Sequence, residues 1–250
     1  MALRCQKKCD DMVWEEQFKI HSQYTGSDCR MTLPSMAQLF QDSAEAHTNH
    51  VSSGYYEMLE EGTAWVLSRI CYEIVQYPML YQDCTVRTWS RGSEGVFALR
   101  DFEFINADNQ LLVRGSSRWV VIDINSRRLL RMGDRFMHGF ESVPRRAIDY
   151  ELGKMTMPDN LQKVNELQVP FSAIDKAKHV NNSVYLRWVA DNLEPQDLGK
   201  PVKFIEINYI HETQMGELIT INRHKEGDTY HFSINNSKGV GFLCRLQMAE

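Results

Sequence analysis

The sequence contains no run of apolar residues long enough to cross a membrane as a helix, for which about 20 are needed. Its first residues lack the apolar core of a secretory signal, and the acidic residues among them argue against a transit peptide. With a net charge of -5, the chain also lacks the basic excess of general nucleic-acid binders. We therefore expect a cytoplasmic protein that neither spans a membrane nor binds nucleic acid.

Cysteine is scarce, with six residues scattered over 250, which suits free thiols in a reducing compartment. Cys5 and Cys9 have the spacing of half a zinc site, but no second Cys or His pair follows at zinc spacing. Gly239-Val-Gly241 lacks the third glycine of a dinucleotide loop and reads as a strand bend. His47 and His50 lack a metalloprotease carboxylate motif, so we expect a partly exposed helix end there. The sequence predicts neither a metal nor a cofactor.

What the chain does have is an ordinary globular composition, with 43% hydrophobic and 24% charged residues. A pattern of strand, helix and antiparallel meander occurs in its first half. The helix is predicted from Leu33-Pro34-Ser35 to about Val51, because Pro34 and Ser35 are helix-start signals. Strands rich in Val, Ile, Tyr, Trp and Phe are predicted at 14–20, 64–74, 84–91, 96–106 and 111–123.

The second half repeats this order, with a helix beginning near Asn182 and strands at 168–172, 203–210, 217–224, 229–235 and 240–248. Residues 27–40 align with residues 174–187 across the two copies. The repetition predicts an α+β architecture of two similar halves, each with a long helix beside an antiparallel sheet. The predicted divisions are an N-terminal domain at 1–125, an arginine-rich linker with short helical pieces at 126–166, and a C-terminal domain at 167–250.

The richest cluster of chemically active side chains comes directly before the second predicted helix. Asp175 is followed four residues later by His179 and then by Asn181 and Asn182, either of which is a natural helix N-cap. N–H groups at a helix start polarise a carbonyl, and a neighbouring carboxylate and imidazole can handle water and protons. Taken singly, Asp175 would more often cap a turn, and His179 would more often be an interior histidine.

Two longer phrases give this cluster a context. The segment DKAKHVNNSVYLRW (175–188), followed by FIEINYIHETQMGELITI (204–221), resembles the C-terminal half of the acyl-acyl-carrier-protein (acyl-ACP) thioesterases. The segment CRMTLPSMAQLFQDSAEAHTNH (29–50) resembles their N-terminal half, so the resemblance covers roughly residues 14–248. It implies a double hot-dog fold, in which each half wraps an antiparallel sheet around one long helix. It also implies hydrolysis of fatty acyl-ACP, which releases the free fatty acid and ends chain elongation in fatty acid biosynthesis. Without a transit peptide, the chain resembles the bacterial branch rather than a plastid precursor.

The family motif, Asp-x-Asn-x-His-Val-Asn-Asn with a later Glu, implies catalytic roles for Asp175, His179 and Glu212. Glu212 or Asp175 would activate water, and His179 would orient the thioester or assist proton transfer, because an imidazole exchanges protons near neutral pH. The helix-start N–H groups near Asn181 and Asn182 would hold the oxyanion, while Asn182 serves equally well as a cap or a substrate contact. A cysteine nucleophile beside Glu212 is discounted, because Thr213 stands there.

The chain departs from the motif at Ala177, which replaces the middle Asn of the substrate-binding set. The resemblance implies that this amide orients substrate or water. If the chain is an active enzyme, water or another residue must supply that hydrogen bond, and if not, this copy is impaired. Two classes of function therefore remain open. The first is a hydrolase of acyl-ACP, or of acyl-CoA as a variant, with the first half shaping the acyl pocket. The alternative is a non-catalytic or weakly active acyl-thioester binding protein of the same fold.

The resemblance also implies partners. Acyl carrier protein is acidic, so an acidic thioesterase needs a local basic patch to dock it. A solvated linker, with scattered pairs to Glu141, Asp134 and Asp149, explains the same arginines without any partner. Hot-dog proteins commonly associate, which implies a homodimer. The pool of basic residues comprises Arg127, Arg128, Arg131, Arg135, Arg145, Arg146 and, near the motif, Arg187.

Overall fold

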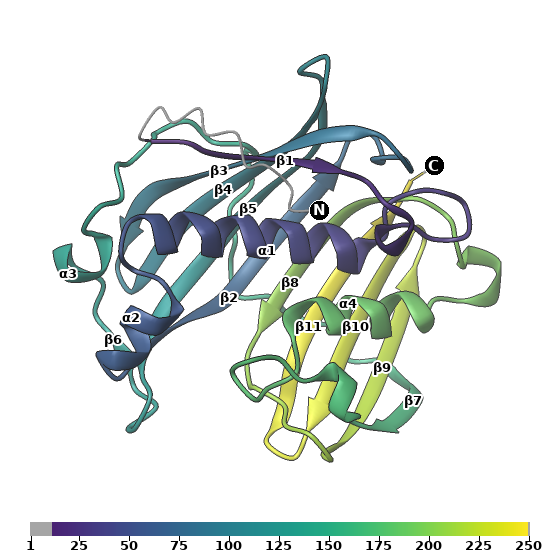
Figure 1. Ribbon diagram of the computed structural model, residues 1–250. Coiled ribbons are helices and arrows are strands. Elements are labelled where there is room, and N and C mark those ends of the chain that lie inside the picture. The colour runs from purple at the N-terminus through teal and green to yellow at the C-terminus, as the bar shows by residue number, and fades with distance from the viewer. Residues whose placement is uncertain (1–11, 250) are drawn as a thin grey trace. The chain divides into compact units, whose positions relative to one another are not determined.

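The computed structural model describes residues 12–249 (Figure 1), so the expectations for Cys5 and Cys9 lie outside the described residues. The chain divides into two compact units. The first contains the chain up to Met31 together with Leu39–Leu152, and the second contains Thr32–Gln38 and the chain from Gly153 onward. Over the described range, no helix is both long and apolar enough to span a membrane.

The first unit is an antiparallel sheet with a long helix packed on it, as the sequence predicts (Figure 1). A short helix and a two-residue strand were not predicted, because such elements are too brief to show periodicity. The strands in sheet order are β1 (Trp14–Lys19), β3 (Asp83–Glu94), β4 (Phe97–Asn106), β5 (Leu111–Asp123) and β2 (Thr63–Ile74), and β6 (Leu129–Leu130) pairs with β5. The helical elements are η1 (Ser22–Tyr24, a 3₁₀ turn), α1 (Leu33–His50, whose residues up to Gln38 group with the second unit), α2 (Tyr55–Glu60) and α3 (Asp134–Met137).

The core of the first unit forms where α1 lies on the sheet. Phe40 is fully buried, and its ring lies 5.5 Å from Tyr72, 4.9 Å from Phe102 and 5.1 Å from Phe104. Phe102 and Phe104 are two residues apart on β4, so both side chains project from the same face toward the helix. Aromatic clusters of this kind bury large apolar areas and fix the helix on its sheet.

The end of α1 differs from the sequence expectation. His47 is buried, stacked on Trp14 at 5.9 Å, and its Nδ1 lies 3.1 Å from a guanidinium nitrogen of the buried Arg100. Of the two histidines at the end of α1, His50 is exposed and His47 is not. The expectation of a partly exposed helix end is therefore wrong for His47, because strands distant in sequence cover it. Burial, followed by the charge of Arg100, lowers the pKa of His47 from 6.5 to about 3.

This shift predicts acid sensitivity. Unfolded His47 binds a proton below about pH 6.5, whereas folded His47 stays neutral to about pH 3. Stability should therefore fall as the pH drops through this window, by ~2 kcal/mol between pH 7 and pH 5. His47→Asn, which cannot titrate, should remove most of that loss in chemical unfolding experiments at the two pH values. His50→Asn is the exposed control, and an unchanged acid response in His47→Asn would contradict the prediction.

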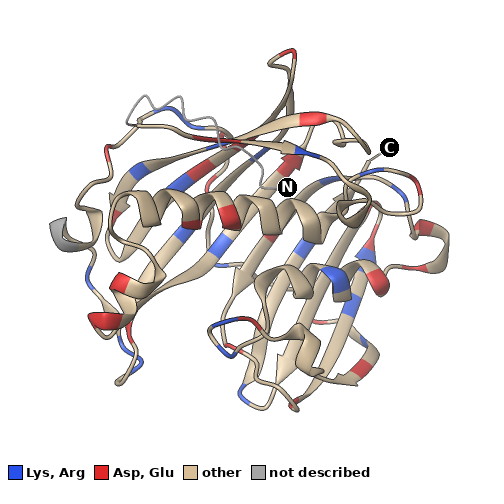
Figure 2. Ribbon diagram, in the orientation of Figure 1, with Lys and Arg blue, Asp and Glu red and all other residues tan. Residues whose placement is uncertain are grey.

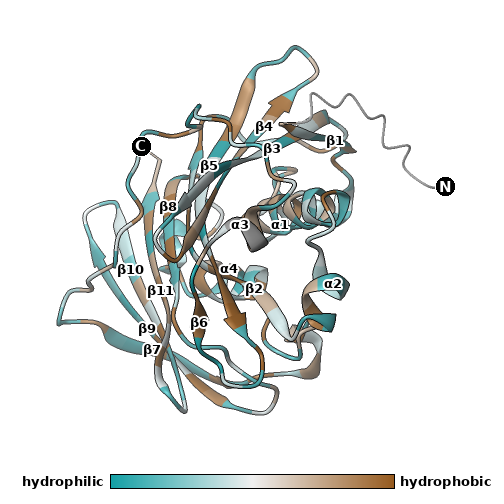
Figure 3. Ribbon diagram, turned by 90° about the vertical axis from the view of Figure 1, so that its left-hand side faces the viewer, coloured by the Kyte–Doolittle hydropathy of each residue, from teal (hydrophilic) through white to brown (hydrophobic). Residues whose placement is uncertain are grey.

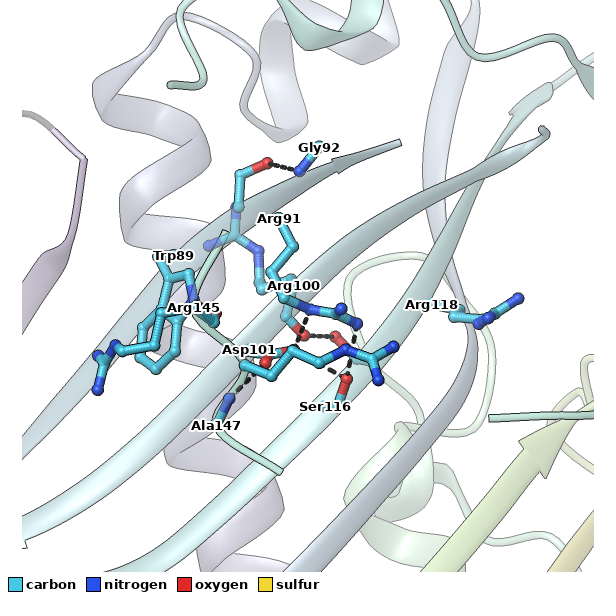
Figure 4. A network of polar contacts seen from close by, with 12 residues as sticks. Trp89, Arg91, Gly92, Arg100, Asp101, Ser116, Arg118, Arg145 and Ala147 are labelled. Atoms are coloured by element: carbon cyan, nitrogen blue, oxygen red, sulfur yellow. Dashed lines mark hydrogen bonds and ion pairs between the residues drawn. The ribbon is translucent and has the colours of Figure 1, made fainter. Parts of the chain in front are cut away.

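A buried carboxylate attaches part of the predicted linker to the first unit (Figure 4). Asp101 is fully buried, and its Oδ1 accepts hydrogen bonds from Arg91 Nε and Ser116 Oγ, both at 2.8 Å. Its Oδ2 accepts the Ala147 N–H at 2.7 Å. Arg145 lies over the Trp89 ring at 4.1 Å, and the Trp89 indole donates to the Arg145 carbonyl. The segment around residue 147 is therefore packed structure rather than a solvated linker.

The second unit contains its own run of antiparallel strands and a helix. The predicted strand at 168–172 is wrong, because the strand lies at Gln162–Gln168 and is followed by a 3₁₀ turn. This strand, β7, is almost entirely exposed and mostly hydrophilic (Figure 3), so it carries no apolar signal and depends on pairing with its neighbour. The sheet order is β8 (Val202–Tyr209), β11 (Gly239–Met248), β10 (Thr229–Asn236), β9 (Leu218–Glu226) and β7; the helical elements are η2 (Phe171–Ala173), α4 (Asn182–Asp191) and η3 (Pro195–Asp197).

Tyr185 fixes α4 on the second sheet. Its buried ring stacks on Phe242 of β11 at 4.8 Å and meets Trp188 and Tyr209 edge to face at 5.3 Å and 5.9 Å. These contacts join α4 to β8 and β11. They thereby place the N-terminus of α4 beside the loop that follows β8.

Candidate active site

The predicted motif lies in the turn between η2 and α4, which contains both acidic and basic residues (Figure 2). The Asp175 N–H donates to the His179 carbonyl at 2.9 Å, and the Lys178 N–H donates to the Asp175 carbonyl at 3.0 Å. The Asp175 carboxylate accepts the Ala177 N–H at 2.8 Å, so it caps this turn. Lys178 adopts a left-handed conformation, with φ 64°, which reverses the chain before His179.

The turn brings two of the predicted groups together. His179 Nε2 lies 3.0 Å from Glu212 Oε2, and Lys238 Nζ lies 3.8 Å from Glu212 Oε1. Glu212 belongs to the loop after β8, whereas Lys238 belongs to the β10–β11 turn. The side chains of His179 and Glu212 are 21% and 29% exposed, so water can reach the pair. The arrangement is a carboxylate held by an imidazole and an ammonium group, and a carboxylate so held can accept a proton from water.

Asn181 is the helix cap rather than an open donor. Its side-chain oxygen accepts the Ser183 N–H at 2.9 Å and the Ser183 hydroxyl at 2.8 Å. Its own N–H donates to the Ala173 carbonyl, and the Val184 N–H donates back to Asn181. The N–H groups of Asn181, Ser183 and Val184 are thus already used within the protein. These bonds argue against an oxyanion role for the three N–H groups, while the expectation for the N–H of Asn182 stays a prediction.

Asn182 and Ala177 occupy different settings. The carbonyl of Asn182 accepts the Tyr209 hydroxyl at 3.1 Å, and its side chain is half-buried at the first helical position. Ala177 is exposed on the turn. His211, beside Glu212, is also exposed. Across residues 12–249, no group of three or more His, Cys, Asp or Glu side chains is arranged to hold a metal ion.

Three residues for which the sequence predicted no role complete the surroundings of Glu212. Thr213 is buried, and its hydroxyl accepts hydrogen bonds from Tyr185 Oη and from Asn236 Nδ2, each at 2.9 Å. Thr213 directly follows the predicted catalytic Glu212, and Tyr185 lies within the motif segment 175–188. Their positions in the sequence could therefore have identified both as residues of the site. Asn236 gave no signal, because only the β10–β11 hairpin brings it to this loop.

The first unit contains a turn with the same hydrogen bonds but other side chains. The Gly26 N–H donates to the Arg30 carbonyl, and the Cys29 N–H donates to the Gly26 carbonyl. Cys29 is also left-handed, with φ 63°. The Met31 N–H donates to Pro78, as the Val180 N–H donates to Thr213.

Matching these bonds places Arg30 at the position of His179 and Tyr77 at that of Glu212. The Arg30 guanidinium lies over the Tyr77 ring at 5.3 Å. The alignment of residues 27–40 with 174–187, which put Thr32 opposite His179, is therefore wrong by two residues. It paired the two aspartates, whereas the backbone turn pairs Gly26 with Asp175.

Comparison with known proteins places this arrangement in context. Residues 11–140 match the acyl-ACP thioesterase N-terminal domain, and residues 157–243 match the acyl-ACP thioesterase C-terminal domain. The chain is 25% identical over 234 residues to oleoyl-acyl carrier protein thioesterase 2 of Arabidopsis thaliana. That match covers 84% of this chain and 62% of the plant protein.

Solved structures share the fold. An acyl-ACP thioesterase from Bacteroides thetaiotaomicron superposes with a TM-score of 0.79 at 21% identity, covering 95% of this chain and 98% of that one. A 12:0-ACP thioesterase from Umbellularia californica gives a TM-score of 0.83 at 18% identity, covering 95% of this chain and 97% of that one. With two domain matches in the expected order along most of its length, the chain belongs to the acyl-ACP thioesterase family.

Proposed function

We propose that this protein hydrolyses the thioester of fatty acyl-ACP and releases the free fatty acid. The observation that carries the proposal is the 3.0 Å contact between His179 Nε2 and Glu212 Oε2 in a water-accessible position. The plant relative is named an oleoyl-acyl carrier protein thioesterase, which supports the same substrate class. Both groups come from the second unit.

The reaction needs a general base, and Glu212 suits this role better than Asp175. The Asp175 carboxylate is used to cap its turn, whereas Glu212 is held by His179 and Lys238 and remains accessible to water. In the proposed step Glu212 takes a proton from water, and the water oxygen attacks the thioester carbonyl carbon. The carbon–sulfur bond then breaks, and the thiolate receives a proton from Glu212 or His179. A substrate contact by Asn182, the other amide of the motif, stays part of the proposal.

We propose further that the two units are tandem hot-dog repeats. Each combines an antiparallel sheet with a helix, and each begins its helix after a turn with the same backbone hydrogen bonds. Arg30 and Tyr77 in the first turn offer neither a carboxylate nor an imidazole. Hydrolysis is accordingly assigned to the second repeat, and the first repeat is assigned to binding the acyl chain.

Thiol release from acyl-ACP and acyl-CoA substrates of several chain lengths tests this function. His179→Ala and Glu212→Gln should each lower kcat by about 100-fold or more, because each removes a group that handles the proton. Lys203→Gln, on the exposed side of β8, is a control that should leave turnover unchanged. Tight acyl-thioester binding without turnover by the unaltered protein would instead establish the binding-protein alternative.

The departure at Ala177 gives a separate prediction. Its side chain is exposed, and only its backbone N–H bonds to Asp175, so Ala177→Asn is compatible with the turn. One restored hydrogen bond to substrate or water should raise kcat about tenfold. Lys176→Asn, on the same turn, provides the matched control for steady-state kinetics. An unchanged rate in Ala177→Asn would mean that another group already supplies this contact.

The contacts of the predicted basic residues indicate which of them are candidates for docking an acidic carrier protein. Arg145 pairs with Glu103 at 2.8 Å, and Arg146 pairs with Asp149 at 3.4 Å and also with Glu151. Arg127, Arg128, Arg131 and Arg187 are exposed, and Arg128 and Arg131 are the pair chosen here for test. We propose that these two contribute most to docking, since their charge is available at the surface. We also propose that the protein forms a homodimer, which a measurement of its molar mass by light scattering tests.

Charge reversal tests the docking surface. Arg128→Glu combined with Arg131→Glu should raise KM for acyl-ACP about tenfold and leave KM for acyl-CoA within twofold. The reason is that these arginines would contact the carrier protein, which acyl-CoA lacks. Lys154→Glu combined with Lys203→Glu makes the same change of net charge elsewhere. Equal increases in KM for both substrates, or for both variants, would place docking at another surface.

A further inference from the structure

Thr213 lies at the centre of a hydrogen-bond network beside the His179–Glu212 pair. The residue is 1% exposed. Its hydroxyl oxygen accepts hydrogen bonds from the Tyr185 hydroxyl on α4 and from Asn236 Nδ2 at the end of β10, both at 2.9 Å. A single threonine oxygen thereby connects the helix after the His179 turn with the hairpin that carries Lys238.

The backbone around Thr213 links the same parts. The Thr213 carbonyl accepts the Val180 N–H at 2.9 Å, directly after His179. Asn236 Nδ2 also donates to the Glu212 carbonyl at 3.2 Å, directly before Thr213. The residues on either side of the His179–Glu212 contact are thus fixed to one another through Thr213.

The donors to Thr213 are suited to this arrangement. Burial raises the pKa of Tyr185 to about 12, even though its bond to Thr213 lowers it, so the hydroxyl keeps its proton and donates. The Asn236 NH₂ group can only donate. Removal of the Thr213 hydroxyl would therefore leave both donors without this acceptor, which costs more than the loss of one ordinary hydrogen bond.

Gly241 provides the space that the hairpin needs. A Cβ atom at this position would lie 3.0 Å from Asn236 Nδ2 and 3.0 Å from the His211 carbonyl oxygen. The Gly241 carbonyl accepts the N–H groups of Ile210 and His211, at 2.8 Å and 3.1 Å. The β10–β11 hairpin is thus bound tightly to the segment that leads into Glu212.

We propose that Thr213 is a positioning residue, which holds Glu212 at hydrogen-bonding distance from His179 through Tyr185 and Asn236. Its effect on turnover rests on the proposed thioesterase function. Its effect on the geometry of the pair does not. Lys238 shares the hairpin, so the same network also places the ammonium group beside Glu212.

A kinetic comparison separates positioning from a merely structural role. Thr213→Val keeps the shape but removes the acceptor, whereas Thr213→Ser keeps the acceptor. We expect Thr213→Val to lower kcat about 10- to 100-fold with KM within twofold, because a small displacement of a reacting group carries a large rate penalty. Thr213→Ser should recover kcat to within about threefold.

Thr63→Val is the matched control, because Thr63 is 3% exposed and its hydroxyl donates to the Met58 carbonyl in the first unit. It should lower stability while leaving kcat unchanged. All rates are taken below the unfolding transition of each variant. An unchanged kcat in Thr213→Val, or an equal loss in Thr213→Ser, would overturn the proposal.

A crystal structure of Thr213→Val supplies a readout that needs no substrate. We expect the His179 Nε2 to Glu212 Oε2 separation to exceed about 3.5 Å, beyond a hydrogen bond. The separation in Thr213→Ser should stay near the 3.0 Å of the native chain. A native separation in Thr213→Val overturns the positioning role. If the unaltered protein shows no turnover while the variants show the expected separations, only the proposed thioesterase function is overturned.

Discussion

The hydrogen bond from the Val180 N–H to the Thr213 carbonyl is the constraint on which the candidate site depends. It joins the turn that ends at His179 to the loop that contains Glu212, and each of these residues is the direct neighbour of a bonded one. Because both groups belong to the backbone, the bond does not depend on which side chains stand at these positions. The corresponding bond from Met31 to Pro78 persists in the first unit, where the side chains are different.

The His179–Glu212 contact cannot itself hold the site together. Both side chains are partly exposed, and ion pairs in such positions contribute about 0–1 kcal/mol to stability. The geometry must therefore be imposed by buried groups nearby. Tyr185 provides much of this support, because its ring is stacked on Phe242 while its hydroxyl reaches Thr213. Groups without a chemical role in the proposed hydrolysis thus hold the two side chains together.

The sequence predicts structure well where a local pattern and burial agree. The bounds of β5 match the expected 111–123, because its apolar and β-branched residues are also the ones that the fold buries. Strand β7 was missed, since its exposed polar residues become a strand only through pairing with β9. His47 was placed on the correct helix but wrongly near solvent, because Trp14 and Arg100, which cover it, are far away in sequence.

The candidate site likewise contains residues that the sequence could predict and residues that it could not. His179 and Glu212 were predicted as partners from motif and resemblance, and the structure brings them together. Asn236 could not be predicted, because its role arises from a hairpin contact rather than from its chemistry. The alignment of the two halves was misled for a related reason. Matching aspartates suggested a register that the backbone turn does not follow, since Gly26, not Asp28, makes the bond that Asp175 makes.

The two turns show how one backbone arrangement can be kept while its chemistry changes. An arginine over a tyrosine ring fills the positions of the imidazole and the carboxylate, and the hydrogen bonds around them remain. A guanidinium stays protonated and cannot take a proton from water, so this pair stabilises its turn without acting as a base. Conservation of the backbone bonds therefore does not by itself indicate a site. The side chains at these two positions distinguish the turn to which we assign the proposed thioester hydrolysis from its counterpart in the first unit.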